Sequence, residues 1–289
     1  MGEGREGRRR RKLRSGKSIS VGDVLEFLNE IYPPSFAMEG DHCGLLCGRR
    51  RVPVGSILVV LDPDRRAFAE ARSAGADLLI SHHPPWAPGR IPPGGRTRLR
   101  AERVPLITAH TNADFAPGGL CDLLAEDLGL ERIRPLMQWQ GLPVGRVGLV
   151  RPPRSWRLFR GRIERSSDDL LRVSGVLPAK VGKVALCSGA GGDLIPAAFK
   201  AGADLFVTGD IKYHSARSVL ELARGRRKGF AVVDAGHFGT EKRFIEATAK
   251  RLARAFPGLR IRRWVDRRPF EPLGGAWSRC RGRREESGR

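Results

Sequence analysis

The string AGADLLIS at residues 74–81 returns at residues 201–208 as AGADLFVT, 127 positions further along the chain. The same offset relates the apolar segment 57–61 to residues 184–188. It also relates His110 to His237 and Asp114 to Glu241. A shared offset over about 58 positions predicts two copies of one structural unit. We find only two copies, which excludes a solenoid, because a solenoid needs at least three repeats.

The repeated unit has the pattern of a strand, a helix and a second strand. In the first copy we expect a strand at 57–61, a helix at 64–74 and a strand at 77–80. These strands are apolar throughout, which is typical of a sheet covered on both faces. Ligands of α/β sheets bind beyond the carboxyl ends of the strands. The sequence therefore predicts an α/β fold of two related units that face a shared metal-site cleft.

Charge is concentrated at the two ends of the chain. The formal net charge is +22, and residues 1–17 and 257–289 contribute +6 each. We divide the chain into a basic leader (1–17), a first unit (18–130), a linker (131–182), a second unit (183–270) and a basic tail (271–289). Basic ends of this kind are typical of solvated segments, and binding of nucleic acid through them is one hypothesis for function.

Composition excludes several classes of protein. With 40% hydrophobic residues the chain can bury a core, so it is not a disordered protein. No apolar run approaches the roughly 18–20 residues of a membrane span, and no apolar region follows the N-terminal charges. The five cysteines are scattered and contain no Cys-x-x-Cys pair, which suits free thiols. We expect a cytoplasmic protein that has no membrane partner.

Histidines follow the predicted strand of the first unit. His82 and His83 follow it after Ser81 and precede Pro84. Adjacent side chains on a strand point to opposite faces, so two neighbours could not bind one ion there. At the end of the strand, each could serve a different ion of a pair. For this doublet alone, a solvated loop is almost as good an interpretation.

Two further sets combine a histidine with a carboxylate four residues later. His237 and Glu241 lie on one face if a helix begins near Phe238, and imidazole with carboxylate suits a divalent ion. His110 and Asp114 have the same spacing, although Pro117 favours a loop there. Four of the six histidines thus fall at equivalent strand ends. Together the sets favour a two-metal site for hydrolysis.

Two other motifs leave alternatives open. The segment 188–192 is rich in glycine and could bind an anion, but a tight turn between a strand and a helix is the better interpretation. Asp210 and His214 could orient metal ligands or donate a proton. Asp210 could equally be the N-cap of the next helix. His110, Asp210 and His214 are our candidate catalytic residues.

Six strings occur together in one known family. They are DHCGLLCG at 41–48, ISHHP at 80–84, AHTNAD-x-APGG at 109–119, CSGAGG at 187–192, TGDIKYH at 208–214 and DAGHFGTE at 234–241. In this order they resemble the Nif-three-like family, whose members are often labelled GTP cyclohydrolase I type 2. The resemblance covers residues 18–264. One departure is His42, which stands where the family usually has Asn.

The resemblance implies a dinuclear metal site with the ligands His82, His83, Asp114, His237 and Glu241, and it makes His110 a neighbour of the site. It also implies a ring-shaped homohexamer, built as a trimer of dimers. The two ions per subunit could be Zn, Mn, Fe, Co or Ni, since histidine and carboxylate suit all of these metals.

The leading hypothesis is therefore a dinuclear metal-dependent hydrolase that acts on a nucleotide or a related small anion. The alternative is a non-catalytic, ring-shaped metal-binding scaffold or regulatory protein. Nucleic-acid binding through the basic ends is the third hypothesis.

Overall fold

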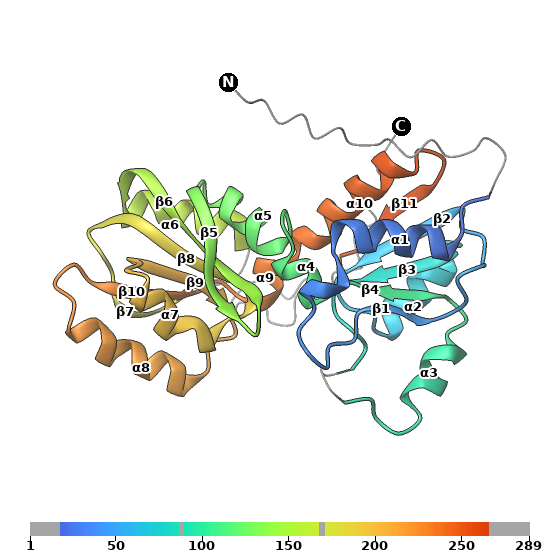
Figure 1. The fold of residues 1–289 in the computed structure, drawn as a ribbon, viewed down its shortest axis with the longest axis horizontal. Helices are drawn as coiled ribbons and strands as arrows, with labels where there is room; N and C mark the ends of the chain where they lie inside the picture. The colour runs from blue at the N-terminus through green and yellow to red at the C-terminus, as the bar shows by residue number, and fades with distance from the viewer. Residues whose placement is uncertain (1–17, 87–89, 168–170, 266–289) are drawn as a thin grey trace, which may run out of the picture.

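The computed structural model describes residues 18–86, 90–167 and 171–265. They form a mixed α/β protein with two sheets, and Figure 1 shows each sheet in a lobe of its own. The short helices α4 (Thr111–Phe115) and α9 (His237–Glu241) lie between the lobes. Residues 1–17 and 271–289, which are the basic leader and the basic tail, lie outside the described residues.

The first sheet has five strands and is covered on both faces. In sheet order the strands are β1 (Gly44–Cys47), β4 (Leu106–Thr108), β3 (Leu78–Ser81), β2 (Ser56–Val60) and β11 (Arg260–Arg263). All are parallel except β1. The helices of this lobe are α1 (Val21–Ile31), α2 (Arg65–Ser73), α3 (Gly95–Ala101) and α10 (Arg243–Ala255).

Alternate residues of β2 point to opposite faces, as the two-residue period of a strand requires. Ile57 and Val59 pack with α1 and α10, whereas Leu58 and Val60 pack with α2 and α3. Because both faces are covered, every residue of β2 is buried. The all-apolar segment thus forms the doubly covered strand that its sequence predicts.

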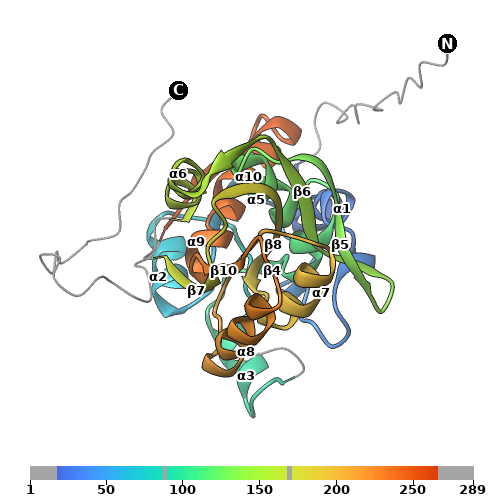
Figure 2. The same cartoon turned by 90° about the vertical axis from the view of Figure 1, so that its left-hand side faces the viewer.

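The second sheet has six strands, and Figure 2 looks onto its lobe. In sheet order they are β5 (Glu131–Trp139), β6 (Leu142–Ser155), β8 (Lys180–Ala190), β9 (Leu205–Gly209), β10 (Phe230–Asp234) and β7 (Arg172–Val176). The helices of this lobe are α5 (Leu120–Asp127), α6 (Trp156–Ser167), α7 (Ile195–Lys200) and α8 (Tyr213–Arg224). Short 3₁₀ turns lie at Pro34–Phe36 and Gly192–Leu194.

Residues 131–182 differ from the linker that the sequence suggests. They include β5, β6, α6 and β7, and three of these elements are strands of the second sheet. The apolar positions that reveal this role, such as Val144 and Val147, are interrupted by arginines, glycines and prolines. These interruptions hide the strand pattern.

The two lobes repeat one arrangement of elements. The strands β2, β3 and β4 are parallel neighbours with an antiparallel β1 beside β4, and β8, β9 and β10 are parallel neighbours with an antiparallel β7 beside β10. The pairing of Ile57 with Leu78 recurs as Val184 with Leu205, 127 positions on.

A side-chain contact repeats with the same offset. The Asp77 carboxylate accepts hydrogen bonds from the amides of Gly55 and Ser56, and Asp204 accepts them from Gly182 and Lys183. Each aspartate joins the start of one strand to the turn before the next. The aspartate that the two strings share therefore has a structural reason that apolar patterning does not provide.

The helices that follow α4 and α9 exchange lobes. Helix α5 directly follows α4, yet its residues Cys121 and Leu124 pack in the core of the second sheet. Helix α10 follows α9, and Phe244 and Leu252 pack against the first sheet. The chain therefore passes between the lobes at both short helices, which places α4 and α9 at the ends of strands from both sheets.

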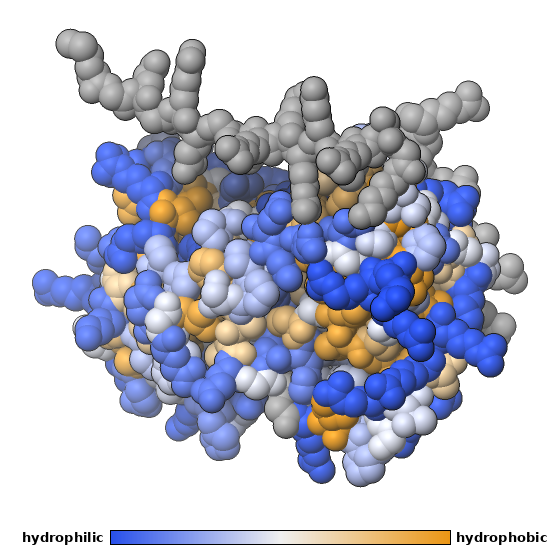
Figure 3. All heavy atoms as spheres, turned by 45° about the vertical axis from the view of Figure 1, so that its right-hand side comes forward, coloured by the Kyte–Doolittle hydropathy of each residue, from blue (hydrophilic) through white to orange (hydrophobic). Residues whose placement is uncertain are grey.

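Hydrophilic side chains cover most of the face in Figure 3, with smaller hydrophobic areas between them. Among the described residues, no helix has the length and apolar character needed to cross a membrane.

Candidate metal centre

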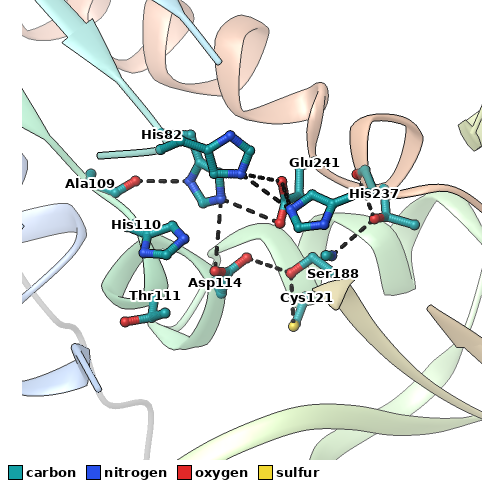
Figure 4. Close-up of polar contacts among 12 residues, drawn as sticks. His82, Ala109, His110, Thr111, Asp114, Cys121, Ser188, His237 and Glu241 are labelled. Carbon is teal, nitrogen blue, oxygen red and sulfur yellow. Dashed lines mark hydrogen bonds and ion pairs between the residues drawn. The ribbon is translucent and has the colours of Figure 1, made fainter. Parts of the chain in front are cut away.

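Three overlapping groups of potential metal ligands lie where the two sets of strand ends meet. They are His82 with His83 and His110, His83 with His237 and Glu241, and His82 with Asp114 and Glu241. Within each group the ligand atoms lie within 4.8 Å of one another. The histidines follow β3, β4 and β10, and the carboxylates lie on α4 and α9 (Figure 4).

Glu241 lies at the centre of the site and is shared by two of the groups. Its Oε2 atom is 2.9 Å from His83 Nε2 and 3.0 Å from His237 Nε2, and its Oε1 atom is 3.6 Å from His82 Nε2. The two oxygens of one buried carboxylate thus face different imidazoles. A carboxylate in this position is able to bridge two ions.

Asp114 completes the group around His82. Its Oδ2 atom is 3.8 Å from His82 Nε2, and its Oδ1 atom accepts a hydrogen bond of 2.6 Å from the Ser188 hydroxyl. Ser188 lies near the end of β8, so a residue of the second sheet fixes a carboxylate of the first half of the chain. This bond leaves Oδ2 directed toward the imidazole.

All four histidines of the site have the same orientation. The Nδ1 partners are Ala109 O for His82 (2.9 Å), Asp62 for His83 (2.7 Å), Asp41 for His110 (2.8 Å) and Asp210 for His237 (2.7 Å). Carbonyl and carboxylate oxygens only accept hydrogen bonds, so Nδ1 carries the hydrogen in each ring. The lone pair of each neutral ring is then at Nε2, as in histidines that bind metals.

The donor atoms fit divalent metal ions. His82 Nε2 is buried and has no hydrogen-bond partner, and His83 Nε2 lies 3.3 Å from His237 Nε2. An unpartnered buried nitrogen is unfavourable, and two imidazole nitrogens this close to each other need a proton or a metal ion beside them. Imidazole and carboxylate are common ligands of Zn, Mn, Fe, Co and Ni. The residues therefore suit the ions that the sequence suggests.

Charges within the site shift the pKa values of its groups. Burial lowers the pKa of His82 to about 4. Burial also lowers the pKa of His83 and His237, but their carboxylate neighbours raise the values to about 10 and about 9. For Glu241 burial raises the pKa, and the surrounding imidazoles hold it well below its usual range. In the metal-free protein, protons thus occupy nitrogens that would bind a cation.

We expect metal binding to tighten as the pH rises. The pKa values of about 10 for His83 and about 9 for His237 lie above the ~6.5 of free histidine, so both rings are protonated at pH 7. A proton must leave each Nε2 before an ion binds, and this competition is lost as the pH rises through the two values. Zn²⁺ affinity should rise about 10- to 100-fold per pH unit between about pH 6.5 and 8.

Calorimetry in two buffers of different ionisation enthalpy measures the protons released. Release of more than about one proton per bound ion would agree with these pKa values. An affinity that does not change with pH would contradict them.

The glycine-rich segment 188–192 carries the chain from the last residues of β8 directly into the 3₁₀ turn Gly192–Leu194, and it lies against Glu241. The Gly189 amide donates to Thr240 Oγ1 and the Gly191 amide donates to Thr208 Oγ1, so neither is free for an anion. Gly189 has a φ of +60°, and a Cβ atom there would lie 2.1 Å from Glu241 Oε1. The turn interpretation is thus the correct one, and the lack of a side chain gives Glu241 its space.

The structure brings all five sequence-predicted ligands, His82, His83, Asp114, His237 and Glu241, into the three groups, and it adds His110. Asp210 contacts His237, whereas the N-cap of α8 is Lys212, so the N-cap interpretation of Asp210 is wrong. His214 is in none of the groups and its ring contacts Tyr213.

The loop expected near His110 is also wrong. Residues Thr111–Phe115 form helix α4, because Pro117 lies beyond its end. Ala116, the residue before the proline, has the extended backbone that a following proline favours. The proline therefore ends the helix and leaves its first turn intact.

The residues that hold the ligands in place are not among those that the sequence predicts for the site. Three residues are hydrogen-bonded to residues of the site: Asp41, Asp62 and Ser188. In the sequence, each has the character of an ordinary loop or strand-end residue. One signal was present for Asp62: like the histidine doublet, it directly follows an apolar strand segment.

Asp210→Asn should weaken metal binding about 10- to 100-fold, because its carboxylate orients His237 and increases the basicity of the ring. Asp210 has a φ of +51°, which asparagine tolerates well, so the substitution changes charge with little added strain. Competition with a chromophoric chelator measures the affinity. The control is Asp193→Asn, an exposed aspartate of the second lobe. Equal losses in both variants would contradict the role of Asp210.

Comparison with known proteins points to one family. The family described as Duf34/NIF3 (NGG1p interacting factor 3) matches residues 19–266. A Lactococcus lactis protein named GTP cyclohydrolase 1 type 2 homolog is 30% identical over 257 residues, which are 84% of this chain and 95% of that protein. A Streptomyces coelicolor protein with the same name is 32% identical over 247 residues, 80% of this chain and 85% of that protein.

A solved structure of a Bacillus cereus protein related to NIF3 has the same fold as this chain. The TM-score is 0.75 at 22% sequence identity, and the match covers 89% of this chain and 100% of that chain. At this identity the likeness is one of fold alone.

Proposed function

We propose that this chain, which belongs to the Duf34/NIF3 family, is a metal-dependent hydrolase of an anionic, nucleotide-like substrate. Its histidines and carboxylates would bind two divalent ions. One ion would be held by His82, Asp114 and Glu241, and the other by His83, His237 and Glu241. The observation that carries the proposal is Glu241, whose two oxygens face imidazoles of both groups.

When bound, two such ions would supply Lewis acidity and a water of lowered pKa. The residues of the chain position this chemistry. Asp62 and Asp210 keep the Nε2 atoms of His83 and His237 turned inward. Ser188 holds Asp114, and the turn at Gly189 allows Glu241 to lie between the two groups.

Exposure indicates from which side a substrate would approach. The side chains of His82, Asp114 and Glu241 are buried, whereas His83 is 19% exposed and His237 32% exposed. We therefore infer that the substrate reaches the ion of the second group, in a cleft shared by the two units. An anion suits this approach, because residues 18–256 carry +10 of the net charge.

The substrate class follows from the relatives as a proposal. The matched relatives are named GTP cyclohydrolase 1 type 2 homologs, so GTP is the first substrate to test. Phosphoesters and cyclic amides suit the same two-metal chemistry. By likeness to the family we also propose a homohexamer, for which light scattering should give six times the mass of the chain.

The experiment couples metal analysis to a screen for activity. Protein loaded with Zn²⁺, Mn²⁺, Fe²⁺, Co²⁺ or Ni²⁺ is tested with GTP, phosphoesters and cyclic amides, alongside His83→Ala. We expect two ions per chain and turnover in the wild type, with both reduced in the variant. Two firmly bound ions without turnover of any substrate would overturn the hydrolase proposal.

Two firmly bound ions without turnover would favour a non-catalytic metal scaffold. The observation behind this alternative is the burial of His82, Asp114 and Glu241, since closed sites are typical of structural metals. A large gain in the temperature of unfolding on metal loading, without turnover, would support it.

A further inference from the structure

His110 differs from the other three histidines of the site. Its Nε2 atom faces no carboxylate among the described residues, whereas the Nε2 atoms of the others lie near Glu241. The His110 ring nevertheless lies close to the centre, with centroid distances of 5.3 Å to His82 and 5.6 Å to His83. Its side chain is 16% exposed. His110 therefore presents Nε2 to the site, and no described residue is hydrogen-bonded to this nitrogen.

Asp41 determines which nitrogen of His110 carries the hydrogen. The Asp41 side chain is only 2% exposed, and its Oδ1 atom lies 2.8 Å from His110 Nδ1. The same carboxylate accepts hydrogen bonds from the Thr111 amide, the Thr111 hydroxyl, the His42 amide and the Cys43 thiol. A carboxylate surrounded by donors can only accept, so Nδ1 donates and the Nε2 lone pair faces the site.

Use of His110 as a third metal ligand would compete with the groups around Glu241. Among the described residues, the only group that contains His110 also uses His82 and His83, and each of these can bind an ion only through Nε2, because its Nδ1 is hydrogen-bonded. Each of those Nε2 atoms already faces Glu241. If Glu241 helps to hold two ions, His82 and His83 are already used as ligands. His110 then has no partner ligands with which to form a separate metal site.

The other two catalytic candidates are less suitable. The Asp210 carboxylate is engaged with His237 Nδ1, and His214 lies outside all three groups. Of the three side chains, only His110 has a nitrogen that is both fixed in direction and available.

We propose that His110 is a catalytic residue that accepts a hydrogen bond at Nε2 from the nucleophile or substrate in the metal site. Asp41 is then a positioning residue, which acts by holding the His110 ring in this tautomer. The inference rests on the proposed function for its catalytic part, whereas the tautomer and the absence of a ligand role can be measured without a substrate.

The first test needs no turnover. Metal content is measured for wild type, His110→Ala and His83→Ala, with His214→Ala as a histidine control outside the groups. We expect His110→Ala to retain both ions and His83→Ala to lose at least one. Nitrogen-15 spectra of the Zn²⁺-loaded wild type should show His110 with the hydrogen on Nδ1. Loss of an ion from His110→Ala, or a hydrogen on Nε2 in the wild type, would overturn the inference.

Asp41→Asn tests the positioning role. In asparagine one of the two carboxylate oxygens is replaced by an NH₂ group, which donates and cannot accept. The NH₂ group must therefore face either His110 and the His42 amide, or the Thr111 amide. We expect the nitrogen-15 signals of His110 to move toward the other tautomer while the metal content stays unchanged. His110→Gln is the second variant, because its carbonyl oxygen can replace the Nε2 acceptor and it avoids disturbing Asp41.

Kinetics with any substrate found in the screen complete the test. We expect kcat of His110→Ala to fall roughly 10²- to 10⁴-fold with little change in KM, and His110→Gln to recover part of it. Equal kcat in His110→Ala and wild type would overturn the inference while the proposed function stands. If the wild type turns over nothing, the proposed function fails, and the metal content and tautomer still decide for or against His110 and Asp41.

Discussion

Glu241→Gln should abolish the binding of both metal ions, and it is the substitution with the largest effect that we expect at this site. Glu241 is the only carboxylate shared by two of the three groups found among the described residues. Its oxygens lie 2.9 Å and 3.0 Å from the Nε2 atoms of His83 and His237, and 3.6 Å from that of His82. Glutamine has nearly the same shape, so the change removes charge and one acceptor with little change in packing.

The expected result is a loss of more than about 100-fold in affinity for each ion, since changes to groups outside the ligand shell already cost about 10- to 100-fold. Elemental analysis after gel filtration should show well below one ion per chain. In the metal-free protein the pKa values of His83 and His237 should also fall, because Glu241 is a principal cause of their rise.

Glu246→Gln is the matched control for this experiment. Glu246 lies on α10, only five positions further along the chain, and pairs with Lys250 at an exposed position. The same change of glutamate to glutamine there should leave the metal content intact. Two ions per chain in Glu241→Gln would contradict a bridging role and leave the histidines as the main ligands.

The strand-end location of the site could be predicted because it depends on local patterns. Apolar segments such as Ile57–Val60 identify buried strands, and polar residues that follow such strands lie at one edge of the sheet. The 127-residue offset then relates His110 to His237 without any knowledge of contacts. A site built from repeated strand ends is thus visible in the sequence, although which atoms face one another is not.

The residues that orient the ligands could not be predicted, because their partners are distant in sequence. Asp41 is 69 positions from His110, and Ser188 is 74 positions from Asp114. Both residues lie in strings that carry the family resemblance, but aspartate and serine are common in loops and at strand ends, so the local sequence does not show which residue each one bonds. Their roles appear only when the two lobes come together.

The exchange of α5 and α10 between lobes was hidden for a related reason. Each helix has an apolar face, which shows that it packs against a sheet but not against which sheet. The division of the chain near residue 130 assumes that a helix packs with the strands that precede it. The short helices α4 and α9 instead carry the chain across the site.

Gly189→Ala should disrupt the metal centre without changing any metal ligand. Gly189 is the second-last residue of β8, and an added Cβ atom would lie 2.1 Å from Glu241 Oε1 and 3.4 Å from His237 Nε2. Carbon and oxygen cannot approach so closely, so either Glu241 or the turn must move. Because the Gly189 amide donates to Thr240 on the same helix as Glu241, the turn itself is held in place.

Displacement of Glu241 should reduce the affinity for both ions by about 10- to 100-fold, comparable to the loss of a residue that orients a ligand. The φ of +60° adds a second effect, since a Cβ atom in the left-handed region costs roughly 1–2 kcal/mol of stability. Chemical unfolding measures the strain, and elemental analysis with chelator competition measures the metal. The two effects need a control that separates them.

Gly75→Ala provides that control. Gly75 has a φ of +62°, nearly the same backbone strain, but an added Cβ atom there would meet nothing within 4 Å. Its variant should lose a similar free energy of unfolding and keep its metal ions. If Gly189→Ala and Gly75→Ala lose stability equally and both retain their metal, Glu241 tolerates the extra atom. The close approach of the turn would then reflect only the backbone conformation, and the metal centre would not depend on it.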